Sequence, residues 1–452
     1  MATGQAIACR IYVRDESGTW WFVSAADARG SALPYSEQWV PMPGSVERHT
    51  TVSADPFRID LPQGTYEMTT ERGKEYRTDV RTIVVADEPI ELTIRLQRWI
   101  DLAERGWYSG ETHVHRRLHE LPNVMQAEDL NVAFPVTFWT IADDAVPDLR
   151  PSTLRSQGPS PFGDREDRGA DPIRLDATHV IFPRNTEYEI FSVQGERHTL
   201  GALFVLNHRT RFDRTAPPIA PIAEQAHREG ALLDLDKHSW PWSLMLVPIA
   251  QIDLYELSNN SVWRTEFGFR SLPESLPGWT KFETDGPQSL TEWGWLEYGF
   301  EIYYALLDCG FRLAPTAGTA SGVHPVPLGH SRVYVQVEQP FSGEAWIEGL
   351  RRGNSFVTTG PMLFATVDGK PAGNEFRLPA GGGTLQLQLE SISERPIERI
   401  ELIRNGRVIQ MLDGRHSLTD SAAHRVVIES TLRFEQSGWL AIRSWQRQKD
   451  GR

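Results

Sequence analysis

The fold is decided by the stretch Gly106-Trp107-Tyr108-Ser109-Gly110-Glu111-Thr112-His113-Val114-His115-Arg116, which we expect to be a β-strand. Side chains on a strand alternate between its two faces, so His113 and His115 should point the same way. Two imidazoles side by side at the end of a strand can bind one metal ion, although surface strands also carry His-x-His by chance. The motif therefore predicts a metal site if other His, Asp or Glu residues converge on it from separate strands.

Size and charge limit the class of protein. The chain has 452 residues, enough for roughly three domains. Its 46 Lys and Arg against 60 Asp and Glu make it acidic, which argues against a nucleic-acid binder, since such a protein would carry basic patches. A small anionic substrate held by a few local Arg or Lys side chains is still compatible with this balance. No apolar run reaches the length of roughly 18 residues that a membrane span needs, so we expect no membrane partner.

The compartment and the oligomeric state stay open. Cys9 and Cys309 are far apart, so they form neither a Cys-x-x-Cys pair nor a disulfide framework. The N-terminal residues Met1 to Arg10 lack the charged segment and apolar segment of a signal peptide. The protein is therefore either cytoplasmic or exported with its signal peptide already removed.

Both ends of the chain read as all-β. Residues 1–100 contain short alternating segments separated by turns such as Pro62-Gln63-Gly64, which predicts an N-terminal β-sandwich. Residues 331–452 return to this style, and Asn405-Gly406 between two alternating runs predicts a hairpin there. We therefore expect a C-terminal β-rich domain as well.

The middle of the chain, residues 101–330, changes character. Strand-like and helix-like segments alternate there, as in βα units, and this predicts a barrel of parallel strands wrapped by helices. The chemistry of such barrels lies at the carboxyl ends of the strands. His113 and His115 end the first predicted strand, His238 follows the strand at 231–236, and His324 lies beyond the strand at 311–317. The pattern thus brings the candidate ligands to one mouth of the barrel.

This middle is also rich in histidine and tryptophan. Ten of the 13 histidines and eight of the 15 tryptophans lie between residues 107 and 330. An imidazole-rich, indole-rich segment is typical of a pocket with a polar floor and aromatic walls, and the alternative is that the indoles simply fill a large core. We expect a small-molecule substrate, anionic or aromatic in character.

Further candidate ligands follow along the chain. Glu187 and Glu189 lie two apart on a predicted strand, so both can face the metal, with Glu187 preferred and a solvated strand face as the alternative. His198 follows after a turn, with an ordinary surface histidine as the alternative, and His208 is a weaker candidate. A glutamate at position 187 or 189 would add a property that the imidazoles lack, since a carboxylate can bridge two metal ions.

Two later stretches complete the set. An apolar strand runs into His238 and Trp-Pro-Trp at Asp234-Leu235-Asp236-Lys237-His238-Ser239-Trp240-Pro241-Trp242, where a proline and two indoles fix the loop. Lys237 could hold an anionic group, although a solvated lysine is the simpler reading. His324 ends the run of small residues from Thr316 to Val323, which lets the backbone approach a ligand closely. Arg116 suits the oxygens of a phosphate or carboxylate, with a plain surface role as the alternative.

The sequence resembles the carbaryl-hydrolase-like (CehA/McbA) metallohydrolases of the polymerase-and-histidinol-phosphatase (PHP) superfamily. The likeness covers roughly residues 101–370, and it is carried by residues 106–116, Ala127-Glu128-Asp129-Leu130-Asn131-Val132-Ala133, Arg332-Val333-Tyr334-Val335 and Gly353-Asn354-Ser355-Phe356-Val357-Thr358-Thr359-Gly360-Pro361. It implies a distorted (β/α)7 barrel, here flanked by N-terminal and C-terminal β-sandwiches. It also implies divalent metal ions such as Zn, Mn or Fe, and hydrolysis of a phosphoester, ester or carbamate.

The resemblance also carries over by position. It implies that His113 and His115 form the opening motif, and that Glu187 is the bridging glutamate. The histidine after it would be His198, and the later histidine usually followed by proline would be His238. The predicted metal ligands are therefore His113, His115, Glu187, His198, His238 and His324.

Two departures from the superfamily pattern reduce the expected site. The second motif normally gives Asp-His, but the corresponding place reads Thr137-Phe138-Trp139-Thr140. The fifth motif is normally Gly-Ser-Asp-x-His, but Ala320 stands where the Asp should be. We therefore expect one or two metal ions. The leading hypothesis is a metal-dependent hydrolase that uses a metal-activated water, with Arg116 and Lys237 as candidate substrate-holding groups. The alternative is a barrel that has lost catalytic groups and binds a glycan or a protein partner.

Overall fold

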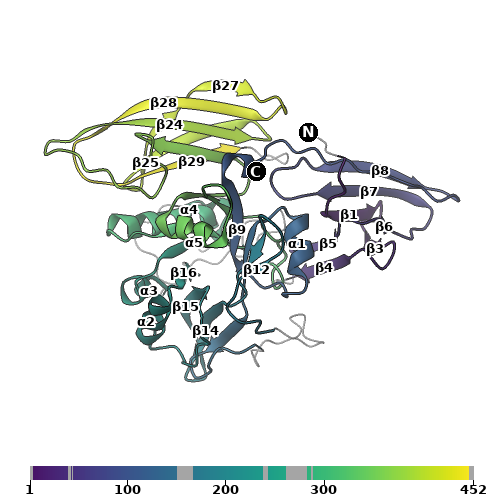
Figure 1. Cartoon of the computed structure of the whole chain (residues 1–452), viewed down its shortest axis with the longest axis horizontal. Helices are drawn as coiled ribbons and strands as arrows, with labels where there is room; N and C mark the ends of the chain where they lie inside the picture. The colour runs from purple at the N-terminus through teal and green to yellow at the C-terminus, as the bar shows by residue number, and fades with distance from the viewer. Residues whose placement is uncertain are drawn as a thin grey trace.

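The computed structural model describes residues 4–38, 42, 44–149, 166–237, 243–260, 282–286 and 289–446, and for residues 197–200 it describes the backbone alone. The chain is mixed α/β and rich in strands, with few helices. In Figure 1 the N-terminal strands (purple) lie to the right, the C-terminal strands (yellow) lie at the top, and the central elements lie below them. None of the described helices is both long and apolar enough to cross a membrane.

The N-terminal strands form an antiparallel six-stranded sheet in the order β4-β5-β1-β7-β8, with β2 beside β1. Its strands are β1 (Cys9–Asp15), β2 (Trp20–Trp21), β4 (Ala32–Gln38), β5 (Val46–Val52), β7 (Gly64–Glu71) and β8 (Asp79–Val85). A separate pair consists of β3 (Ser24–Ala25) and β6 (Phe57–Arg58). Alternation builds the sheet, since Tyr66 and Met68 of β7 are buried while Glu67 between them is exposed. The sheet-rich character is as predicted, and the domain limit at residue 100 stays a prediction.

The first central sheet has the strand order β12-β13-β10-β9-β21-β22. Its strands are β9 (Trp107–Val114), β10 (Val132–Pro135), β12 (Ile173–Arg174), β13 (Val180–Ile181), β21 (Arg332–Gln336) and β22 (Ser355–Thr358). The strand β9 lies in the middle, parallel to β10 and antiparallel to β21. Trp346 of α5 (Gly343–Arg352) covers it, and a Cβ on Gly110 would lie 2.3 Å from that indole. Since β21 and β22 follow residue 330, they pair across the predicted domain limit there, which also stays a prediction.

The second central sheet has the order β11-β14-β15-β16-β17-β20. Its strands are β11 (Phe138–Ala142), β14 (Thr186–Val193), β15 (Glu196–Leu206), β16 (Leu232–Asp236), β17 (Leu254–Ser258) and β20 (Ala314–Ala317). A short pair, β18 (Thr284–Gly286) and β19 (Ser289–Leu290), lies apart from it. The remaining helices of this region are η1 (Ala103–Arg105), α1 (Leu121–Ala127), α2 (Ala220–Glu229), α3 (Ser243–Ala250) and α4 (Glu292–Asp308). The helix α2 ends at Gly230, whose φ of 78° places it in the left-handed region that favours glycine.

The described residues do not show a closed (β/α)7 barrel, because the central strands are divided between two sheets. Moreover, β15 runs antiparallel to both of its neighbours, β14 and β16. A tight turn at Gly195 (φ 79°) joins β14 to β15, and it leaves no length of chain for the helical crossover that parallel strands require. The two sheets nevertheless come together at the end of β9, where His115 donates its N–H to the carbonyl of Ser321 (2.9 Å) in the loop after β20.

The C-terminal strands form two sheets that share one apolar core. One sheet contains β23 (Met362–Val367), β24 (Gly383–Ser393), β28 (His424–Phe434) and β27 (Arg415–Leu418), and the other contains β26 (Arg407–Leu412), β25 (Ile397–Arg404) and β29 (Leu440–Gln446). The predicted hairpin at Asn405-Gly406 is confirmed. Arg404 pairs with Arg407 across it, and both turn residues have positive φ, 47° and 72°.

Candidate metal centre

The predicted His-x-His pair lies where the sequence pattern puts it, at the carboxyl end of β9. His113 and His115 are both buried, and their Nε2 atoms are 3.2 Å apart. The loop after β20 supports this end of the strand, because Ala320 donates its N–H to the carbonyl of His113 (2.9 Å). A Cβ on Gly318 would lie 2.2 Å from the Cβ of His113, so the loop packs this closely only because residue 318 is a glycine.

Glu187 of β14 joins the pair from the second sheet. Its Oε2 lies 3.4 Å from the Nε2 of His115, and both side chains are almost fully buried. The three residues His113, His115 and Glu187 offer one ligand atom each within 4.8 Å of one another. The structure thus brings together the opening motif and the carboxylate that the sequence analysis preferred.

Two further carboxylates, which the sequence analysis did not identify as ligands, lie on the other side of His113. The Nδ1 of His113 is 3.0 Å from Oε2 of Glu256 on β17 and 3.8 Å from Oδ2 of Asp236 at the end of β16. These residues form a second triad, with ligand atoms again within 4.8 Å. The sequence did hold a signal, because Asp234 and Asp236 repeat the two-residue spacing of the His pair within an apolar strand.

Burial dominates the electrostatics of the centre. It lowers the pKa of His113 to about 4, so this imidazole is neutral at physiological pH, as a metal ligand must be. Burial and the neighbouring Asp236 raise the pKa of Glu256 well above its usual value. Burial also raises the pKa of Asp234, which accepts a hydrogen bond from Thr316 Oγ1 (2.8 Å). Carboxyl groups with such raised pKa values lack enough positive charge around them.

Asp236 is the exception among these carboxylates. Against the effect of burial, Lys237 and His113 lower its pKa. Within the described part of the chain, its buried Oδ1 has no hydrogen-bond partner. A buried carboxylate oxygen without a partner is costly. Together with the neutral imidazole of His113, this oxygen fits a site for a divalent metal ion that takes mixed nitrogen and oxygen ligands.

Of the other predicted site residues, one lies near the centre, one lies elsewhere, and two fall outside what the structure describes. The imidazole of His324 is half-buried, and it lies close enough to His113 and Lys237 for them to influence its pKa, which burial lowers well below the usual value. His238 and the side chain of His198 lie outside the described residues. The weaker candidate His208 lies elsewhere, hydrogen-bonded to Thr186 Oγ1 (2.8 Å) and the carbonyl of Thr210 (2.8 Å).

The two predicted substrate-holding groups have protein partners. The guanidinium carbon of Arg116 lies 4.3 Å from the ring centroid of Tyr35, which β4 brings from the N-terminal sheet. The ammonium of Lys237 contacts Asp236 Oδ2 and lies 3.4 Å from Glu189 Oε1. At the place of the absent Asp-His motif, the indole of Trp139 packs on the ring of His115, with 4.8 Å between centroids. The departures therefore leave an aromatic wall beside the centre.

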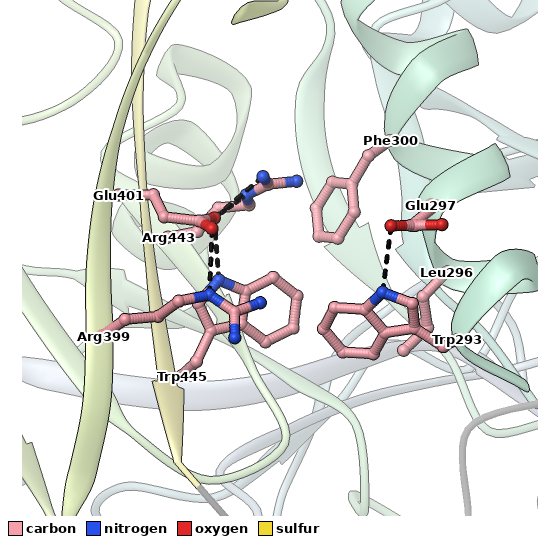
Figure 2. A pocket seen from close by; sticks show the side chains of 8 residues that line it. All are labelled: Trp293, Leu296, Glu297, Phe300, Arg399, Glu401, Arg443 and Trp445. Carbon is pink, nitrogen blue, oxygen red and sulfur yellow. Dashed lines mark hydrogen bonds and ion pairs between the residues drawn. The ribbon is translucent and has the colours of Figure 1, made fainter. Parts of the chain in front are cut away.

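A pocket lies apart from the centre, between α4 and the strands β25 and β29. It has a volume of about 120 Å³ and is lined by Trp293, Leu296, Glu297, Phe300, Arg399, Glu401, Arg443 and Trp445. Figure 2 shows Glu401 of this pocket between the two arginines, with the α4 side chains opposite. None of the centre's His, Asp or Glu residues lines it.

Comparison with known proteins gives little further information. No protein-family model matches the chain, and no curated protein matches it. A similar solved structure is that of a two-domain protein containing a predicted PHP-like metal-dependent phosphoesterase from Bacteroides vulgatus. The identity is 11%, the TM-score is 0.36, and the match covers 74% of this chain and 88% of that chain. Both the identity and the TM-score are too low to support a function for this chain, so the functional assignment depends on the residues of the centre.

Proposed function

We propose that this chain is a metal-dependent hydrolase of the PHP superfamily, of the carbaryl-hydrolase-like kind, which cleaves a phosphoester, ester or carbamate. One observation carries the proposal: two buried triads, His113–His115–Glu187 and His113–Asp236–Glu256, share an imidazole. Protein interiors rarely hold so many ionisable groups without a cation. The hydrogen bond from His115 N–H to the carbonyl of Ser321, in the loop after β20, joins the first central sheet to the second and supports the further proposal that these sheets are parts of one distorted (β/α)7 barrel.

A divalent ion in such a site supplies Lewis acidity and lowers the pKa of water toward about 7. The chain's own residues orient the ligands. Glu256 accepts a hydrogen bond from His113 Nδ1, which leaves Nε2, next to Nε2 of His115, as the nitrogen that can bind a metal. Trp139 packs against His115 and keeps bulk water from that side of the imidazole. We assign metal binding to His113, His115 and Glu187, and orientation of His113 to Glu256.

The test combines metal analysis with hydrolysis assays. We expect purified protein to contain Zn, Mn or Fe and to hydrolyse aryl phosphates, aryl esters or aryl carbamates. His113→Ala should lower hydrolysis at least about 100-fold, because even partners behind metal ligands account for about 10-fold to 100-fold. His416→Ala is the matched control, since His416 is exposed on β27, and it should keep full activity. Hydrolysis that survives both complete metal removal and His113→Ala would overturn the proposal.

The alternative, a barrel that binds a glycan or a protein partner, finds its best support in the aromatic pocket of Figure 2. The polar groups of that pocket already have partners, however. Glu401 accepts hydrogen bonds from Arg399 (3.0 Å), Arg443 (2.8 Å) and Trp445 (2.8 Å). A pocket whose charges are paired internally offers less to a ligand than the centre does. We therefore favour the hydrolase.

A further inference from the structure

The end of β16 places a positive charge inside the candidate metal centre. Neighbouring residues of a regular strand point to opposite faces, but Lys237 has a φ of 55° and so departs from strand geometry. As a result, the ammonium of Lys237 lies on the same side as the carboxylate of Asp236 and contacts its Oδ2. The departure from regular backbone geometry thus directs a lysine into the centre.

The ammonium is enclosed by carboxylates. Besides Asp236, its Nζ lies 3.4 Å from Oε1 of Glu189. Glu187 and Glu256 are also close enough for their charges to act on the ammonium. Only 17% of the lysine side chain is exposed, and 1% of Asp236. Lys237 is therefore a fixed cation among four carboxylates.

The shared imidazole restricts where metal ions can bind. A neutral imidazole has one nitrogen that donates a proton and one that accepts or binds a metal. The Nδ1 of His113 is 3.0 Å from Glu256 and its Nε2 is 3.2 Å from His115. If Nε2 binds an ion together with His115 and Glu187, then Nδ1 carries its proton toward Glu256 and cannot bind a second one. The second triad then keeps only carboxylates, and Lys237 already contacts one of them.

We infer that Lys237 takes the place of a second metal ion. The chain would bind one divalent ion, at His113 Nε2, His115 and Glu187, while the ammonium neutralises Asp236 and Glu189. The inference rests on the proposed metal-binding function and fixes its stoichiometry. It also assigns to Lys237 a role in the centre in place of holding the substrate's anionic group.

The test is a count of bound ions in the full chain, with Co²⁺ and Zn²⁺ as probes. Equilibrium dialysis followed by elemental analysis gives the count, and the visible absorption of Co²⁺ gives an independent signal for each site. We expect one ion in the wild type and two in Lys237→Met, since removal of the ammonium leaves the oxygens of Asp236, Glu189 and Glu256 for a second ion. Lys237→Arg keeps the charge and should bind one ion. Lys370→Met, at an exposed lysine, is the matched control and should also bind one.

The possible results separate the two proposals. Two ions in the wild type, or one ion in Lys237→Met, would overturn the inference and leave the proposed function standing. No ion in the wild type would overturn the metal-dependent function itself. If Lys237→Met does not fold, Lys237→Gln, which keeps a polar end at similar length, is measured in its place under the same two criteria.

Discussion

The pKa values of two glutamates, Glu256 and Glu401, are shifted in opposite directions in this protein. Glu256 lies in the metal centre, where burial and Asp236 raise its pKa well above the usual value. Glu401 lies in the pocket between α4 and the C-terminal strands, where Trp445 and two arginines lower its pKa against the effect of burial. Burial opposes ionisation at both sites, so the difference comes from the cations and donors that the chain itself provides. Glu401 is satisfied by the protein, whereas Glu256 lies in a site that is short of positive charge.

The groups around Glu401 also hold one another. The guanidinium of Arg399 lies 4.9 Å from the ring centroid of Trp445, and that of Arg443 lies 4.8 Å from the ring of Phe300. Such stacking fixes the arginines in the geometry that Glu401 needs. The pocket in Figure 2 is therefore best understood as a self-sufficient contact between α4 and the C-terminal sheet. The metal centre, by contrast, needs a cation from solution.

The largest expected effect comes from Glu256→Gln. In metal-free protein, this change removes a carboxyl group whose ionisation burial and Asp236 oppose, and it keeps an oxygen for His113 Nδ1, so we expect it to stabilise the fold by about 1 kcal/mol. With metal, the wild type should gain about 3 kcal/mol at an ion concentration of about 100 times Kd. The variant should lose most of that gain, because its ligand His113 is less well oriented. Denaturant unfolding with and without Zn²⁺ measures both differences.

The sign of the metal-free effect is the decisive part of that experiment. If Glu256→Gln destabilises metal-free protein as much as it destabilises the loaded form, Glu256 is an ordinary structural carboxylate and the contrast with Glu401 fails. Asp308→Asn serves as a control, because Asp308 accepts a hydrogen bond from Trp439 (2.7 Å) in an exposed setting away from the centre. It should not change the response to Zn²⁺.

Local patterns in the sequence predicted half of this centre. The spacing of His113 and His115 fixes their common face once β9 is a strand, and the same rule identified Glu187. Glu256 could not be found in that way, because a single acidic residue in an apolar strand has no periodicity. It enters the centre only because β16 and β17 pair in parallel, with Asp234 opposite Leu254. That register is a property of the assembled sheet.

The fold was predictable to a similar degree. Turn chemistry predicted the hairpin at Asn405-Gly406, since such a turn depends on residues that tolerate positive φ. The order and direction of the central strands were not predictable. The hairpin at Gly195 makes β14 and β15 antiparallel, although each strand alone resembles those of a βα unit. Likewise, the left-handed backbone of Lys237 turns its ammonium into the centre, which strand alternation does not predict.

A smaller effect is expected for Glu401→Gln, and it should have the opposite sign in metal-free protein. The change leaves Arg399 and Arg443 without their carboxylate, so we expect a loss of about 2 kcal/mol, discounted for the partial exposure of both arginines. Because the folded pKa of Glu401 is lowered, its stabilisation is present above the unfolded value of about 4.3 and is lost as the pH falls through the folded pKa. The difference between wild type and variant should therefore be full at neutral pH and shrink below about pH 4. A difference that stays constant over this range would show that the ion pairs contribute nothing.

The smallest effect tests which part of the Glu401 contact matters. Trp445→Phe keeps an aromatic ring beneath Arg399 but removes the Nε1 donor that lies 2.8 Å from Glu401, so we expect a loss of about 1 kcal/mol in the free energy of unfolding. Trp293→Phe is the matched control. It removes the Nε1 hydrogen bond to Glu297 (2.9 Å), which spans one turn of α4 and is less buried, so it should cost less than about 0.5 kcal/mol. Equal losses in the two variants would mean that ring packing, and not the hydrogen bond to the carboxylate, holds α4 against the C-terminal sheet. In that case the low pKa of Glu401 would depend on the arginines alone, and the contrast with Glu256 would reduce to the number of cations that the chain places beside each glutamate.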